Sequence, residues 1–172
     1  MVKYNIIQRI FHWLMAFVII SLIGAGFYMT NLGQSDPSKY EIYSMHKTIG
    51  TLALVLVTIR VLVRIFSKIP DLPREITSFE KLLAKLGHFA LYFFMISMPL
   101  AGVIMSLYSG RSINFFGIEI KDLVEVNHDI AKIAHKFHMT IPIYFAGLIM
   151  LHSFAVIYHY VKQKINLLQR IW

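Results

Sequence analysis

The segment HMTIPIYFAGLIMLHSFAVIYHYV, residues 138–161, contains no aspartate, glutamate, lysine or arginine. A membrane-spanning helix needs about 20 consecutive apolar residues, so this segment is long enough to cross a bilayer. Two histidines within it, His138 and His152, are fourteen residues apart. In a helix this spacing separates them by about 21 Å along the axis but by only about 40° around it. The segment therefore predicts a membrane helix with two histidines on one face, each near a different membrane surface.

Three other segments have the same apolar character. They cover residues 10–31, 42–66 and 82–107. The segment at residues 138–161 lies within a longer helix that we expect at about 130–161. Hydrophobic residues make up 57% of the 172 residues and charged residues only 15%, so the chain is more apolar than ordinary soluble domains. We predict an all-α fold, an integral membrane four-helix bundle that forms a single domain over residues 1–172. The first apolar segment is not followed by a small-residue cleavage site, so we expect it to be retained.

Basic residues are distributed unequally between the two sides of this topology. If the N-terminus is cytoplasmic, eleven of the seventeen lysines and arginines fall on the cytoplasmic side and six on the other. Basic residues concentrate in cytoplasmic loops, so both termini are predicted to be cytoplasmic. The net charge of +8 is then explained by the orientation of the helices in the membrane. The sequence shows no soluble basic domain, so it gives no reason to expect nucleic-acid binding. The cytoplasmic set is Lys3, Arg9, Arg60, Arg64, Lys68, Arg74, Lys81, Lys85, Lys162, Lys164 and Arg170.

The chain has no cysteine. This excludes disulfides, thiolate-bound iron–sulfur clusters and covalently attached c-type haem. A redox centre would have to be held by nitrogen, oxygen or thioether ligands, and histidine is the strongest candidate.

Depth in the membrane sorts the histidines into two pairs. His46 and His138 lie near the outer ends of their helices, whereas His12 and His152 lie near the inner ends. Each pair would bring two imidazoles from different helices to one iron, which is how a b-type haem is held in a helix bundle. Histidines at helix ends can instead cap carbonyl groups, but ionisable groups within a span usually mark function. His88 in place of His12 remains open as an inner ligand.

Other polar residues near the inner surface extend this hypothesis. Arg60 and Arg64 are four residues apart and share a helix face, so they are candidates to bind haem propionates; snorkelling to lipid headgroups is the alternative. His88 and His159 are surplus to one haem, and with Lys85 they could bind a quinone and supply protons. Plain solvation at the interface is the competing interpretation for these histidines.

The outer surface is less informative. Lys47, Lys132 and Lys136 lie close to the outer histidines in sequence and could attract a small anionic electron donor. The longest connection, residues 110–129, alternates apolar and charged residues over part of its length. It is predicted either to cover the outer membrane surface or to be an ordinary solvated loop.

Several motifs together resemble a known family. The segments RIFHWL (9–14), MHKTIG (45–50) and LGH (86–88), together with His138 and His152, resemble the bacterial cytochrome b561 family over nearly the whole chain. The resemblance implies a dihaem cytochrome of the bacterial inner membrane, and related members are superoxide oxidases that reduce ubiquinone. The arrangement is also similar to that of the cytochrome b subunits of membrane-bound hydrogenases and formate dehydrogenases.

Three functions are therefore considered. The leading hypothesis is an oxidoreductase with two b-type haems that takes electrons from superoxide, or another periplasmic donor, and reduces ubiquinone. The second is a membrane anchor that relays electrons between a hydrogenase- or dehydrogenase-type partner protein and the quinone pool. The third is a haem-free transporter or metal-binding membrane protein whose histidines bind Zn²⁺ or protons.

Overall fold

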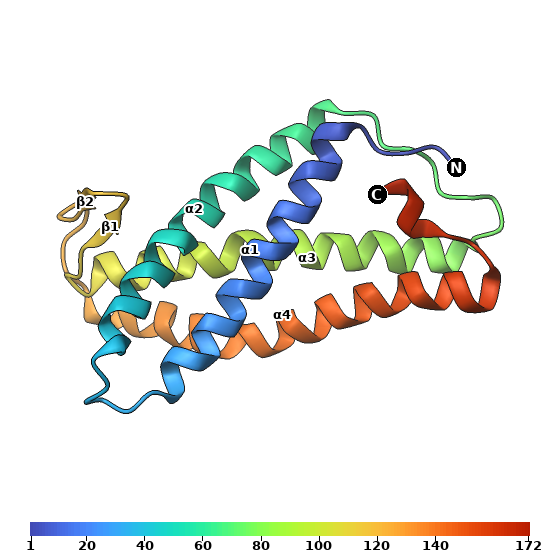
Figure 1. The fold of residues 1–172 in the computed structure, drawn as a ribbon. Helices are drawn as coiled ribbons and strands as arrows, with labels where there is room; N and C mark the ends of the chain where they lie inside the picture. Colours follow the sequence, from blue (N-terminus) through green and yellow to red (C-terminus); the bar gives the residue numbers. More distant parts are fainter.

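The structure is a computed structural model that describes all 172 residues. Four long helices dominate it, and each is long and apolar enough to cross a membrane, which confirms the predicted four-helix membrane bundle. Figure 1 shows a small hairpin at one end of the bundle and both chain termini at the other. We call these the hairpin end and the termini end. The elements are α1 (Ile6–Asn31), α2 (Ser38–Phe66), α3 (Ser78–Tyr108), β1 (Ile113–Phe115), β2 (Ile118–Ile120), α4 (His128–Gln163) and the 3-10 helix η1 (Leu167–Arg170).

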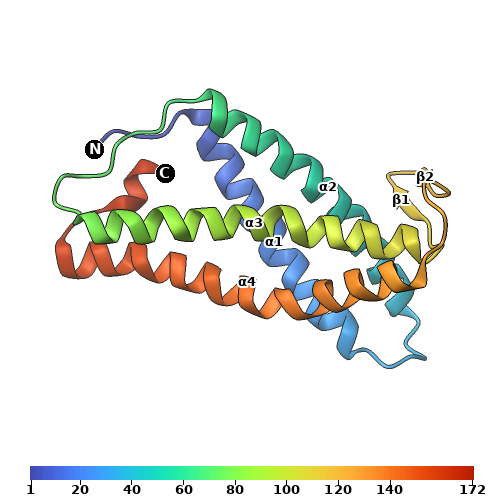
Figure 2. The same cartoon turned by 180° about the vertical axis from the view of Figure 1, so that it is seen from behind.

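The helices pack as two antiparallel pairs. Figures 1 and 2 show α3 and α4 side by side along most of their length, with α1 and α2 crossing them as a second pair. The buried core lies in the middle of the bundle and consists of Met15, Ile19, Val57, Met95 and Phe145. Phe145 is seven residues from each of the two histidines of α4, so this core separates two histidine levels. Many large apolar side chains on the outside are exposed, as expected for surfaces that face lipid.

The helices extend beyond the apolar segments because polar residues cap them. The Asn5 side chain accepts a hydrogen bond from the backbone of Gln8, whose own side chain accepts one from the backbone of Asn5. Thr77 and Glu80 form the same reciprocal capping box at the start of α3. Such caps satisfy backbone groups that a helix terminus leaves free. The capped helices α1 and α3 each begin four residues before the segments predicted from hydropathy, and α2 does so as well without a side-chain cap.

The connection between α3 and α4 contains an antiparallel hairpin. Its strands pair Ile113 with Ile120 and Phe115 with Ile118, and the two-residue turn of Phe116 and Gly117 has φ values of 51° and 91°. Two positive φ values are characteristic of the tight turn that fits the twist of a hairpin. The hairpin packs on α2. Of the two predicted alternatives, the surface cover is closer to the observed structure than the ordinary solvated loop.

At the termini end, Arg170 joins three segments of the chain. Its side chain is 5% exposed, and its guanidinium donates hydrogen bonds to the carbonyl oxygens of Pro70 and Asp71, which lie between α2 and α3. The guanidinium also lies over the ring of Tyr4, 5.3 Å from its centroid. The indole of Trp13 donates to the carbonyl oxygen of Ile171. The C-terminal segment is therefore bound to the start of α1 and to the α2–α3 connection.

Candidate functional site

The hairpin end holds a pair of imidazoles from two helices. His46 lies in α2 and His138 in α4, with ring centroids 6.2 Å apart and ring planes at 87°. The Nδ1 atom of His138 lies 3.0 Å from the carbonyl oxygen of Met98. Because a carbonyl oxygen only accepts hydrogen bonds, this Nδ1 carries the proton and Nε2 is free to bind a metal. His138 is therefore held in a tautomer suited to metal coordination.

Two further features of this hairpin-end pair indicate capacity for a bound group. The Nδ1 atom of His46 is buried and has no hydrogen-bond partner. A Cβ atom added at Gly102 would lie 3.1 Å from Cε1 of His138, so a larger residue would press on that imidazole. Both imidazoles line a cavity that is also lined by Ile113 of β1. The hairpin thus forms part of the wall of this site.

The ring separations fit coordination of one iron by two histidines. An imidazole nitrogen binds a first-row metal at about 2.0–2.1 Å, and the ring centre is about 1.1 Å farther, so two opposed rings stand about 6.3 Å apart. The centroids of His46 and His138 are 6.2 Å apart, and those of His12 and His152 are 6.3 Å apart. The equal spacing at both ends supports the predicted pairs. No group of three or more histidine or acidic side chains is arranged to hold a bare metal ion.

The termini end gathers three imidazoles. His12 of α1 and His152 of α4 form the termini-end pair, and the ring centroid of His88 in α3 is 5.5 Å from that of His152. The Nδ1 atom of His88 lies 2.6 Å from the carbonyl oxygen of Ala84, which fixes this ring in the same tautomer as His138. The ring separation between His12 and His152 matches the separation of the hairpin-end pair, whereas that between His88 and His152 is shorter. The His88 ring therefore lies next to the predicted inner ligand His152.

Arg60 of α2 contacts the termini-end pair directly. Its Nη2 atom donates to Nδ1 of His12 at 3.2 Å, so the neutral His12 ring carries its proton on Nε2, and coordination of a metal through Nε2 requires this contact to change. Nη1 donates to the carbonyl oxygen of Phe11 at 3.1 Å. The Arg60 guanidinium also lies 5.6 Å from the ring centroid of Tyr92, and that of Arg64 lies 5.4 Å from the same centroid. The two arginines therefore share a face, as their spacing predicts. Tyr92 was missed, because nothing in the hydropathy pattern of its helix marks it.

Similarity to a known family extends over nearly the whole chain. The model of a family described as prokaryotic cytochrome b561 matches residues 3–172. The chain belongs to this family. It is accordingly a multi-pass membrane protein of electron transfer, and membership in the family implies that it binds haem b.

Individual relatives cover almost the whole chain. It is 27% identical to cytochrome b561 homolog 2 of Escherichia coli K12 over 98% of this chain and 90% of that protein. It is 25% identical to the probable superoxide oxidase CybB of Yersinia pestis over 98% and 95% of the two chains. Cytochrome b561 homolog 1 of Escherichia coli K12 is 24% identical over 98% and 96%. These relatives support an oxidoreductase in the broad sense.

The residues predicted for a quinone site all lie at the termini end, but they do not form one contact cluster. Lys85 is exposed and His88 faces His152. His159 instead contacts Gln163, with 2.8 Å between its Nδ1 atom and the Oε1 atom of the amide. In this cytochrome b561 family member, His88 and His159 therefore belong to separate local environments.

A short hydrogen-bonded chain orients His159. The amide nitrogen of Gln163 donates to a carboxylate oxygen of Glu80 at 2.5 Å. An ionised carboxylate only accepts hydrogen bonds, so the oxygen of Gln163 faces His159 and accepts from its Nδ1. The Nε2 atom of His159 is thereby left for another partner. Sequence reasoning missed Glu80 and Gln163, since they are 83 residues apart and meet only through the packing of α3 on α4.

The lysines predicted near the donor differ in their surroundings. Lys47 is half-buried and its ammonium donates to the carbonyl oxygen of Ser112 at 3.1 Å. Lys132 and Lys136 are exposed on the first turns of α4. On the hairpin itself, a hydrogen bond from Lys121 lowers the pKa of the exposed Glu119 carboxyl. The hairpin end therefore combines exposed cations with one lysine that also fastens the hairpin.

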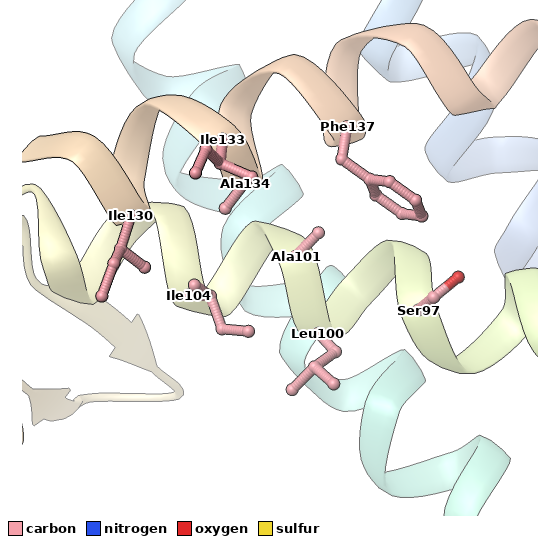
Figure 3. Close-up of a pocket in the computed structure, with 8 residues that line it drawn as sticks. All are labelled: Ser97, Leu100, Ala101, Ile104, Ile130, Ile133, Ala134 and Phe137. Carbon is pink, nitrogen blue, oxygen red and sulfur yellow. The ribbon is translucent and has the colours of Figure 1, made fainter.

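A separate cavity lies between α3 and α4 and contains no histidine. Figure 3 shows its side chains projecting from these two helices. Several of them are exposed on the outer surface, so the cavity opens toward lipid in a membrane, and no charged group lines it. It therefore offers no group for redox or acid–base chemistry. The lining residues are Ser97, Leu100, Ala101, Ile104, Ile130, Ile133, Ala134 and Phe137.

Proposed function

We propose that this chain is a dihaem b-type cytochrome that oxidises superoxide to dioxygen at the hairpin end and reduces ubiquinone near the termini end. The observation that carries the proposal is the repeated spacing of two imidazole pairs. His46 with His138 and His12 with His152 have nearly the same ring separation, 6.2 and 6.3 Å, at opposite ends of a bundle that can span a membrane. These four residues are the proposed axial ligands of two haems.

The proposed reaction balances in electrons and protons. Two superoxide anions each lose one electron to become dioxygen, and one ubiquinone takes up those two electrons and two protons to become ubiquinol. Haem b, when bound, supplies one-electron exchange between ferric and ferrous iron. The protein holds the two pairs about 21 Å apart along α4, from the fourteen residues between His138 and His152.

At the donor end, the side chains support a small anion as substrate. Lys132 and Lys136 are exposed on α4 beside the hairpin-end pair, and cations near a site raise the local concentration of an anion. The name of the relative from Yersinia pestis, a probable superoxide oxidase, is consistent with this choice.

At the quinone end, two imidazoles each keep an Nε2 atom that can take up a proton and then donate it to a carbonyl oxygen. Neither the Nε2 atom of His88 nor that of His159 is used by the hydrogen bonds that orient these rings. Lys85 is exposed one turn before His88. We propose that these residues bind the quinone and pass protons to it, and that Arg60 and Arg64 bind haem propionates.

The proposed orientation places the termini end in the cytoplasm of a bacterium. Both termini lie at one end of the bundle (Figure 1), and this end carries eleven of the seventeen lysines and arginines. The positive-inside rule then makes the hairpin end periplasmic. Superoxide would be oxidised outside the inner membrane, and protons for the quinone would come from the cytoplasm.

The experiment mixes the purified haem-loaded protein with a superoxide source and a water-soluble ubiquinone. We expect superoxide to reduce the haem in the absence of quinone and ubiquinol to accumulate in its presence. Superoxide dismutase, added as a control, should abolish both signals. Haem that stays oxidised, or quinone that stays oxidised while superoxide is consumed, would reject the reaction.

A second candidate is an anchor that relays electrons to or from a hydrogenase- or dehydrogenase-type protein. The exposed Phe116 and Ile118 at the hairpin tip favour it, because apolar side chains outside the helices can contact a partner protein. This function predicts co-purification with a soluble redox subunit from mild detergent, and no haem reduction by superoxide alone.

A further inference from the structure

The two imidazole pairs differ in the charge next to them. At the termini end, Arg60 is half-buried and touches His12, Phe11 and Tyr92 together. An arginine side chain remains protonated at any ordinary pH, so this contact is a permanent positive charge. Its Nη2 atom lies 3.2 Å from the His12 imidazole, whereas no cationic side chain is hydrogen-bonded to an imidazole of the other pair.

At the hairpin end, the nearest polar groups are neutral. The His138 imidazole donates to the backbone carbonyl of Met98, and Nδ1 of His46 has no partner. Lys47 is the one charged residue that lines the cavity shared by these rings, and its ammonium is bound to the carbonyl of Ser112. The ammonium of Lys47 is thus hydrogen-bonded to the hairpin and not to either imidazole.

We propose that Arg60 raises the reduction potential of the termini-end site above that of the hairpin-end site and so directs electrons toward the termini end. Reduction adds one negative charge to the iron site. A fixed positive charge within a few ångströms stabilises that reduced state, and a low-dielectric interior screens the attraction only weakly. The contacts of Arg60 with Phe11 and Tyr92 hold this charge in place.

This role does not depend on where the haem propionates lie. If Arg60 also binds a propionate, its charge still offsets negative charge beside the iron, and its removal still lowers the potential. Lys162 provides the comparison, because it is an exposed cation in the last turn of α4 at the same end of the bundle and has no proposed role at the haem. The inference rests on the two-haem arrangement proposed above.

The test is an optical redox titration of the haem-loaded protein in lipid nanodiscs, which resolves one wave per haem. Arg60→Gln should lower one wave, so that the equilibrium between the two haems shifts at least tenfold toward the hairpin-end site, equivalent to 59 mV for one electron. The other wave should not move. Arg60→Lys should retain most of the wild-type potential because it keeps the charge. Lys162→Gln should shift the equilibrium less than threefold.

Two outcomes would overturn the role of Arg60. One is a protein with both haems in which Arg60→Gln leaves both waves in place, and the other is an equal shift from Lys162→Gln. If Arg60→Gln does not retain both haems, Tyr92→Glu is the test variant and Tyr92→Gln is its uncharged control. The glutamate would neutralise the charge of Arg60 without removing its side chain. It should lower the potential of the same haem, so that the equilibrium between the two haems shifts at least tenfold. A single haem in the wild-type protein would reject the dihaem proposal instead, so the two failures are distinguishable.

Discussion

The hairpin end and the termini end present the same pair of ligands in different surroundings. His46 and His138 are surrounded by backbone groups, a close glycine and a hairpin wall, whereas His12 and His152 are accompanied by His88 and Arg60. One end is built to enclose an imidazole pair, and the other supplies additional imidazoles and a charge. The comparison teaches that equal ligand spacing does not make two sites equivalent, because the neighbouring residues set their chemistry.

The largest expected effect comes from removing one ligand at a time. His46→Ala or His138→Ala should leave one haem per chain with an unchanged termini-end spectrum, and His12→Ala or His152→Ala should leave the opposite haem. His88→Ala should retain both haems, because the spacing of His12 to His152 already fits coordination. Haem is counted per chain by the pyridine haemochrome assay. Loss of haem in His88→Ala but not in His12→Ala would show that the termini-end ligands are His88 and His152.

A second prediction concerns enclosure at the hairpin end alone. Gly102→Val should weaken haem binding there by at least tenfold, because the new side chain would press on His138 and overpacking costs about 1–3 kcal/mol. The termini-end haem should be unaffected. Gly147→Ala is the matched control, since nothing lies within 4 Å of a Cβ atom at that position. Equal haem content in both variants would show that the glycine at position 102 is not needed for enclosure.

A third prediction concerns stability at the termini end. Arg170→Ala should destabilise the protein by about 1–3 kcal/mol, because it removes a buried donor and leaves the carbonyls of Pro70 and Asp71 without it. The melting temperature, followed by tryptophan fluorescence, should fall. Lys162→Ala removes an exposed cation from the same end and should have little effect. Similar melting temperatures for the two variants would contradict a structural role for the C-terminal segment.

The smallest expected effect is a pH dependence at the hairpin end. Hydrogen bonds from the side chain and backbone of Ser38 lower the pKa of the half-buried Asp36 carboxyl. A carboxyl whose pKa is lower in the folded state stabilises it above the unfolded pKa, and this contribution is lost as the pH falls through the folded value. Between pH 7 and pH 3, the melting temperature of the wild type should therefore fall slightly more than that of Asp36→Ala. Glu75→Ala, which removes an exposed acid at the termini end, should behave like the wild type.

Much of the fold was predictable from local patterns. Four apolar segments of spanning length predict four helices, and the spacing of His138 and His152 predicts two levels of ligands on α4. The family was also identified from short motifs around His12, His46 and His88, and the family match over residues 3–172 confirms it. The hairpin was less predictable, because its strands are three residues long and their alternating pattern also fits a surface loop.

The sequence by itself determined the number of spans, the helices that carry each histidine and the depth of each histidine, because hydropathy and helical periodicity are local properties. Only the tertiary structure decided which neighbours those histidines have. Arg60 reaches His12 across 48 residues, and Gln163 reaches Glu80 across 83. Such contacts depend on how the two helix pairs cross and on which face each helix turns inward. The sequence therefore placed extra histidines and arginines at the inner level, and the structure shows which of them contact the termini-end pair and which residues enclose the pair at the hairpin end.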